Sequence, residues 1–133
     1  MQRFRPRLVA VLAGAFFAGA LSAAAGEVVL YSSNSVDAIN AVTEEFQKAN
    51  PGIKISAVRG STGAMMQRIK AEAGAPKADI FWSGGFAVLG LYEDYFAPYK
   101  SAEAAGIAAN YKSPKDLWLG TNAHVMVIMV NKR

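Results

Sequence analysis

Apolar segments and amphipathic segments alternate along the chain. The apolar run at residues 27–31 predicts a buried strand, and the alternating residues 53–58 predict a second one. Between them, from Val36 onward, apolar side chains recur every three or four residues, as they do on one face of an amphipathic helix. A second helix is predicted over residues 64–73 and a third strand over residues 78–82. Strands and helices that alternate with short connections are typical of an α/β fold, with a mostly parallel sheet flanked by helices.

The rest of the chain carries a weaker pattern. Residues 86–95 favour a further helix, and residues 97–117 are mixed, with alanine-rich pieces broken by proline and glycine. The apolar run at residues 124–130 predicts a strand that is covered on both faces of a sheet. Because only three residues follow this run, we expect the chain to be truncated rather than to end a complete domain.

The first 25 residues have the composition of an export signal. Arg3, Arg5 and Arg7 precede an apolar run at residues 8–21, and small residues follow at 22–26. This order of basic, apolar and small residues predicts a secretory signal peptide, residues 1–25, that is cleaved after the last alanine. The apolar run is short for a membrane span, which needs roughly 20 residues, so a retained anchor is the less favoured alternative.

The net charge and the lack of cysteine exclude several classes of protein. The formal net charge is +4, but removing three arginines from the 14 basic residues leaves 11 against 10 acidic residues, or +1 for residues 26–133. This balance predicts no nucleic-acid binding. The chain has no cysteine, which excludes thiolate catalysis, disulfides and the lipid attachment of a lipoprotein. We therefore expect a monomer that is free in solution in the periplasm.

Three polar loops follow the three predicted strands, at residues 32–35, 59–63 and 83–85. They consist of Ser, Thr, Asn and Gly, with Arg59 as their one cation and no carboxylate. Right-handed crossovers place all three loops at the carboxyl edge of a parallel sheet, where ligands of open α/β sheets bind.

Such loops are suited to an anion. Helix N-termini offer unpaired N–H groups and a partial positive charge, and hydroxyl groups add donors that can rotate toward a ligand. The alternative is that Ser33, Ser35, Thr62 and Ser83 each cap the helix that follows them. Because three such loops are predicted at one edge, we favour a ligand site for phosphate, phosphonate or carboxylate groups.

Catalytic residues are scarce. His124 is the only histidine and lies in the last apolar run, so no second histidine is present for a metal site. A small secreted serine hydrolase that uses Ser61 or Ser83 would need His124 as its general base, and is a remote alternative. The sequence does not decide whether Trp82 packs in the core or lines a pocket. Asp79 lies at the amino end of its predicted strand, and we expect it to make a local structural bond.

Several segments together resemble a known family. The stretches "VVLYSS", "EEFQKANPGIKIS", "GSTGAMMQRIKAEAGAPKADIFW" and "HVMVIMVNK" are similar to the bacterial extracellular solute-binding proteins of ABC importers, most of all to the branch that handles ferric iron and 2-aminoethylphosphonate. The resemblance implies a periplasmic-binding-protein-like fold (type II) with two α/β lobes that hold a ligand between them. Residues 26–133 resemble the first lobe, and the resemblance implies that the chain is truncated before the second lobe.

The resemblance also bears on the ligand. Iron-binding relatives place a His in the first loop and a Glu in the second, where this chain has Ser35 and Gly63, neither of which can hold Fe³⁺. The loop positions fit phosphonate- or phosphate-binding relatives better. The residues that this resemblance assigns to the ligand are Ser33, Asn34, Ser61, Thr62 and Ser83, with Arg59 and Gly84 in second rank.

The sequence thus leads to a function without catalysis. We expect the substrate-binding component of an ABC transporter, which captures a small oxyanion such as a phosphonate or phosphate ester and delivers it to an inner-membrane permease. It would use no cofactor and no metal. A ferric-iron receptor whose ligands have changed is the main alternative.

Overall fold

The computed structural model describes residues 26–123 and 128–131. Strands and helices alternate as the sequence predicts, and the elements lie close to their expected positions. These elements are β1 (Gly26–Ser32), α1 (Val36–Ala49), β2 (Ile53–Arg59), α2 (Thr62–Ala71) and β3 (Ile80–Trp82). The α/β fold class is therefore confirmed.

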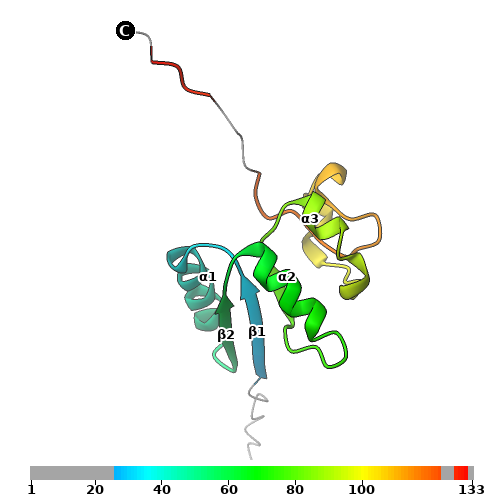
Figure 1. The fold of residues 1–133 in the computed structure, drawn as a ribbon. Helices are drawn as coiled ribbons and strands as arrows, with labels where there is room; N and C mark the ends of the chain where they lie inside the picture. Colours follow the sequence, from blue (N-terminus) through cyan, green and yellow to red (C-terminus); the bar gives the residue numbers. More distant parts are fainter. Residues whose placement is uncertain (1–25, 124–127, 132–133) are drawn as a thin grey trace, which may run out of the picture.

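The three strands form one parallel sheet in the order β2-β1-β3. The chain moves from β1 to β2 in one direction, and then from β2 past β1 to β3 in the other. Right-handed crossovers therefore place α1 and α2 on opposite sides of the sheet, as Figure 1 shows. In the register of the sheet, Ser32 of β1 is level with Arg59 of β2 and with Trp82 of β3. All three strands thus end at the same height.

Local sequence sets the ends of the two long helices. The side chain of Ser35 caps α1 by accepting a hydrogen bond from the backbone of Ala38, and Ser61 caps α2 in the same way by accepting one from Ala64. At the end of α1, the Asn50 backbone N–H donates to Phe46, and the proline that follows cannot continue the helix. The expected cap at Ser35 is confirmed.

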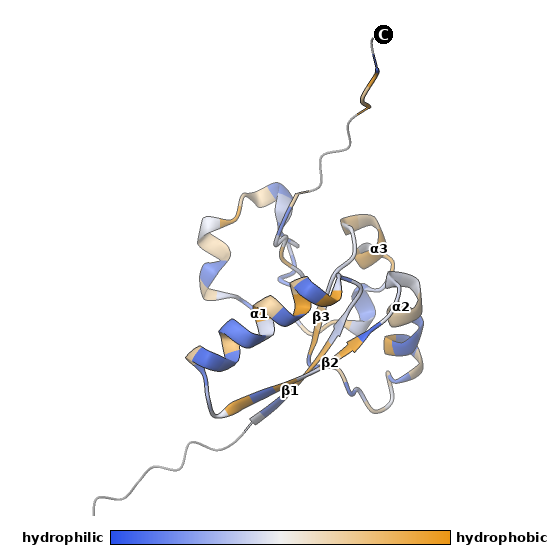
Figure 2. Ribbon diagram, turned by 90° about the vertical axis from the view of Figure 1, so that its left-hand side faces the viewer, coloured by the Kyte–Doolittle hydropathy of each residue, from blue (hydrophilic) through white to orange (hydrophobic). Residues whose placement is uncertain are grey.

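A small core lies around the carboxyl half of β1. Leu30 and Tyr31 are buried there, together with Met65 and Met66 of α2. The apolar stripe of α1 is buried only at Ile39, because this helix packs chiefly on the edge strand β2. Figure 2 shows the mixed hydropathy of α1 along its exposed length.

Strand β3 is shorter than predicted and is held at its start by Asp79. The Asp79 carboxylate accepts a hydrogen bond from the Val29 backbone N–H at 2.8 Å, and its own N–H donates to the Val29 carbonyl at 3.0 Å. The prediction that Asp79 makes a local structural bond is confirmed.

The segment after β3 is less regular than the predicted helix. Residues 86–95 divide into α3 (Phe86–Gly90) and the 3₁₀ turn η1 (Glu93–Tyr95), because Gly90 disfavours continuation of the helix. The alanine-rich pieces form the 3₁₀ turns η2 (Ala102–Gly106) and η3 (Ala109–Tyr111). No helix of the described ranges is long and apolar enough to cross a membrane.

The predicted strand at residues 124–130 is wrong for the part that the structure describes. Residues 124–127 lie outside the described residues, whereas Ile128, Met129 and Val130 have no strand structure and are 92%, 93% and 76% exposed. In Figure 1 this segment extends away from the sheet. An apolar run becomes a buried strand only where neighbouring elements cover it, and no described element covers these residues.

A polar brace joins β1 to the end of α2. The buried Tyr31 hydroxyl donates to Glu72 at 2.9 Å, and Arg68 pairs with the other carboxylate oxygen of Glu72 at 2.9 Å. The Arg68 guanidinium also lies 4.9 Å from the centre of the Tyr31 ring. The hydrogen bond from Arg68 lowers the pKa of Glu72, while burial raises the pKa of Tyr31.

We predict that Glu72 makes the stability of the fold depend on pH. Because its folded pKa is depressed, its contribution is present above the ordinary value of 4.5 and is lost as the pH falls through the lower folded pKa. Urea unfolding between about pH 6 and pH 3 should therefore show a steeper loss of stability in the wild type than in Glu72→Gln. Glu45→Gln, which removes a largely exposed partner of Lys48, should keep the wild-type slope. Identical slopes for all three proteins would contradict the role of Glu72.

Candidate functional site

Three hydroxyl groups from three different loops meet at the carboxyl edge of the sheet. Ser33 follows β1, Thr62 opens α2 after β2, and Ser83 follows β3. The Ser33 hydroxyl is 2.8 Å from that of Thr62 and is also hydrogen-bonded to that of Ser83. All three side chains are half-buried, so one side of this hydroxyl cluster (Ser33, Thr62 and Ser83) is open to solvent. The expected convergence of the three loops is confirmed.

The hydroxyl cluster has one O–H group that its internal hydrogen bonds do not use. Three hydroxyls carry three protons, and the two hydrogen bonds among them use two of these, so one O–H is left over whichever way the bonds run. If an acceptor-rich group displaced these internal bonds, all three hydroxyls could rotate and donate to it. The cluster is therefore suited to several acceptor oxygens at one point, and it carries no charge of its own.

None of these three hydroxyls caps a helix. The capping residues are Ser35 and Ser61, whose side chains accept from backbone N–H groups within the first turns of α1 and α2. The capping alternative is thus wrong for Ser33, Thr62 and Ser83. The predicted ligand residue Ser61 has a structural partner and is not a member of the hydroxyl cluster.

Two further side chains hold the first loop against the end of β3. The buried Ser32 hydroxyl donates to the Trp82 carbonyl at 2.7 Å and accepts from the Asn34 backbone N–H at 3.1 Å. The Asn34 side-chain amide donates to the same carbonyl at 3.1 Å. Asn34 therefore positions the loop that carries Ser33. Sequence reasoning missed Ser32, although its place at the last position of the central strand was a signal for a buried polar side chain.

Arg59 supplies positive charge beside the site. Its Nε donates to the Asn34 carbonyl at 2.9 Å, which ties the end of β2 to the first loop, and its side chain is otherwise exposed. Gly84 has φ of +87°, and a Cβ there would lie 3.4 Å from the ring of Phe81 and 3.6 Å from the methyl group of Thr62. A glycine is thus needed for the turn that brings Ser83 to the cluster.

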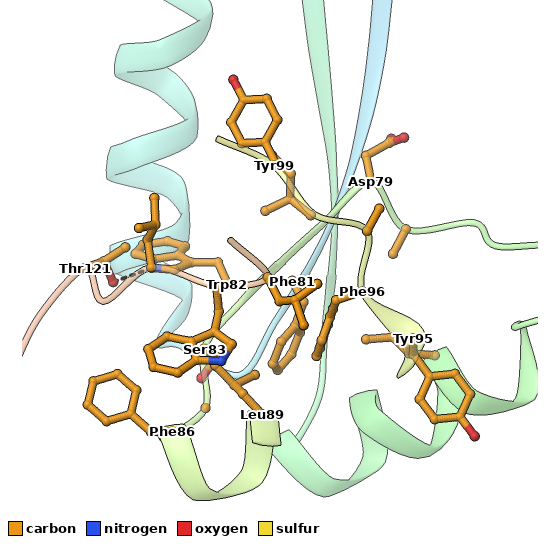
Figure 3. A pocket seen from close by; sticks show the side chains of 18 of the residues that line it. Asp79, Phe81, Trp82, Ser83, Phe86, Leu89, Tyr95, Phe96, Tyr99 and Thr121 are labelled. Atoms are coloured by element: carbon orange, nitrogen blue, oxygen red, sulfur yellow. Dashed lines mark hydrogen bonds between the residues drawn. The ribbon is translucent and has the colours of Figure 1, made fainter. Parts of the chain in front are cut away.

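A groove of about 1390 Å³ begins at Ser83, one member of the hydroxyl cluster, and runs along β3. Asn34, Ser83 and Gly84 line its near end, and Asp79 lies at the far end of the strand. Its walls are largely aromatic, as Figure 3 shows, with Trp82 donating from its indole N–H to Thr121 at 3.4 Å. Trp82 is therefore part of a pocket wall. The loops near the end of the described chain that complete this groove were not foreseen from the sequence.

A comparison with known proteins decides the family. Residues 32–133 match the family of bacterial extracellular solute-binding proteins. The chain belongs to this family. Its members are transport proteins rather than enzymes, so the serine hydrolase alternative is wrong. His124, the general base that such a hydrolase would need, lies outside the described residues.

Individual relatives are similar over part of their length. Iron uptake protein A1 of Synechocystis sp. is 31% identical over 109 residues, which are 80% of this chain and 30% of that protein. The Trichodesmium protein IdiA (FutA), solved in complex with iron and citrate ligands, is 31% identical with a TM-score of 0.65, covering 71% of this chain and 31% of its own. AfuA of Actinobacillus pleuropneumoniae, solved with exogenous fructose-6-phosphate bound, is 22% identical with a TM-score of 0.61, covering 68% and 28%. At that identity the likeness shows the fold alone.

The solute-binding protein described here spans about a third of the length of these relatives. The described part of the chain holds no group of three or more His, Cys, Asp or Glu side chains that could bind a metal ion. The three loops bring neutral hydroxyls and one cation to the carboxyl edge, and no carboxylate.

We predict that Gly84→Ala destabilises the fold by about 1–2 kcal/mol, because an L side chain disfavours a positive φ. Gly85→Ala is the matched control, since Gly85 has an extended backbone and open space around its Cα. Thermal unfolding of the two variants measures the difference. Equal melting temperatures would show that the turn at Gly84 relaxes without cost.

Proposed function

We propose that the chain captures a small oxyanion, such as a phosphonate or phosphate ester, at the hydroxyl cluster. The observation that supports this most directly is the meeting of Ser33, Thr62 and Ser83 from three loops at the edge where parallel α/β sheets bind ligands. Arg59 adds a positive charge nearby, and the three loops contain no carboxylate that would repel an anion. The remaining predicted ligand residues take supporting roles: Asn34 and Gly84 shape the loops, and Ser61 caps α2.

The same proposal includes the organisation of the chain. Residues 1–25 are an export signal, and residues 26–133 are an N-terminal lobe that works with a second lobe and an ABC permease in the inner membrane. Three or four hydrogen bonds to a charged ligand contribute roughly 1.5–3 kcal/mol each. Association costs about 4 kcal/mol or more, so one lobe alone should bind weakly, in the millimolar to low micromolar range at best. Closure of a second lobe would exclude water and tighten this binding.

Ferric iron is the second candidate. Iron uptake protein A1 and IdiA, which are named or solved with iron, are each 31% identical to this chain. Hard Fe³⁺ prefers anionic ligands, and the hydroxyl cluster offers none, so iron would need ligands from elsewhere. A visible charge-transfer band on adding ferric citrate, as tyrosinate–iron complexes give, would favour this candidate over the oxyanion.

We predict that phosphate and 2-aminoethylphosphonate perturb the backbone amide signals of Ser33, Thr62, Ser83 and Gly84 in a nuclear magnetic resonance titration of the purified chain. The triple variant Ser33→Ala, Thr62→Val, Ser83→Ala should weaken binding by about tenfold or more, because it removes every donor of the cluster.

Thr43→Val is the matched control, because the Thr43 hydroxyl bonds back to the Ile39 carbonyl within α1, away from the carboxyl edge. It should bind both anions as the wild type does. If the triple variant kept the wild-type affinity, or if the shifts fell on other residues, the hydroxyl cluster would not be the anion site.

A further inference from the structure

The hydroxyl cluster is much smaller than the groove that opens beside it. Ser83 belongs to both, since its hydroxyl bonds to Ser33 while the residue lines the near end of the groove. The groove volume of about 1390 Å³ exceeds the roughly 300–1,000 Å³ of ordinary small-molecule sites. An inorganic phosphate held by the three hydroxyls would leave nearly all of this space unused.

The walls next to Ser83 are aromatic rings in mutual contact. The ring of Phe86 is stacked on that of Trp118 with centroids 4.8 Å apart, and lies 6.0 Å from the ring of Tyr111. These three residues form an aromatic cluster (Phe86, Tyr111 and Trp118). Phe86 is the first residue of α3 and is separated from Ser83 only by the Gly84-Gly85 turn, so it links the cluster to the hydroxyls. Phe86 is 41% exposed, which leaves part of its ring available for contact with a ligand.

Charges along the groove limit what can enter it. Apart from Lys77, the charged residues of its lining are the carboxylates Glu72, Asp79 and Asp94. Asp79 lies at the amino end of β3, at the opposite end of the strand from Ser83. A second anionic group on the ligand would meet these carboxylates, whereas a neutral or cationic group would not.

We propose, building on the oxyanion function above, that the groove holds the organic substituent of the bound anion. The ligand class is then an organophosphonate or phosphate monoester with an apolar or aromatic substituent, rather than free inorganic phosphate. The hydroxyl cluster holds the oxygens of the anionic group, and the substituent lies on the aromatic cluster. Stacking and burial of apolar surface give the preference for such ligands.

Tryptophan fluorescence reports directly on this groove. The chain has two tryptophans, Trp82 and Trp118, and both line it. We predict that phenylphosphonate changes the emission and binds about tenfold more tightly than methylphosphonate, which presents the same anionic group without the ring. Phosphate in excess should displace phenylphosphonate, because both need the hydroxyl cluster.

Two matched variants test whether the preference for phenylphosphonate comes from the groove. Phe86→Ala should abolish most of the advantage of phenylphosphonate over methylphosphonate, whereas Phe46→Ala should keep it. The two phenylalanines are exposed to the same extent, 41% and 40%, but Phe46 lies on α1 outside the groove. Tyr111→Ala serves as a second groove variant if Phe86→Ala does not fold, because Tyr111 belongs to the aromatic cluster, lines the groove and is 38% exposed.

The outcomes separate this inference from the proposed function. Equal affinity for the two phosphonates, or an advantage that survives both groove variants, overturns the groove assignment and leaves the anion site standing. Absence of binding by phosphate and by both phosphonates overturns the anion site, and the groove assignment falls with it.

Discussion

Parallel pairing of β1 with a strand on each side is the constraint on which the site depends. Its register makes Ser32 level with Arg59 and with Trp82, so three loops that are distant in sequence begin at one height on the same edge. The buried Ser32 hydroxyl strengthens this arrangement, because it links the end of β1 to the Trp82 carbonyl of β3. A slip in register would move the loops apart and would leave this hydroxyl without its partner.

The strand order explains why the hydroxyls meet beside β1 and β3. The order β2-β1-β3 reverses direction at the central strand, and at such a switch point the loops on either side turn away to opposite faces of the sheet. The space between them is open to a ligand. Ser33 and Ser83 border this space, and Thr62 reaches it from the start of α2. The groove along β3 includes Asn34 and Ser83 in its lining, so polar side chains and aromatic rings lie near each other at this edge.

Local patterns in the sequence were sufficient for most of the fold. The alternation of apolar runs and amphipathic segments predicted all three strands and both long helices, and the cap at Ser35 followed from residue type. Errors arose where burial decides the outcome. The apolar residues 128–130 have the composition of a buried strand, but they are exposed because no described element covers them. A separate error lies at Gly90, where the low helix propensity of glycine divided a helix that the apolar pattern predicted.

By itself, the sequence determined the fold class, the three polar loops and the absence of carboxylates from them, because these follow from residue types and short-range periodicity. Tertiary structure alone decided which hydroxyls share hydrogen bonds across the three loops. Ser61 and Thr62 are adjacent and chemically alike, yet the first caps α2 and the second joins the hydroxyl cluster. Thr62 joins the cluster because its hydroxyl reaches that of Ser33, which is 29 residues away in the sequence, and no local pattern encodes this contact.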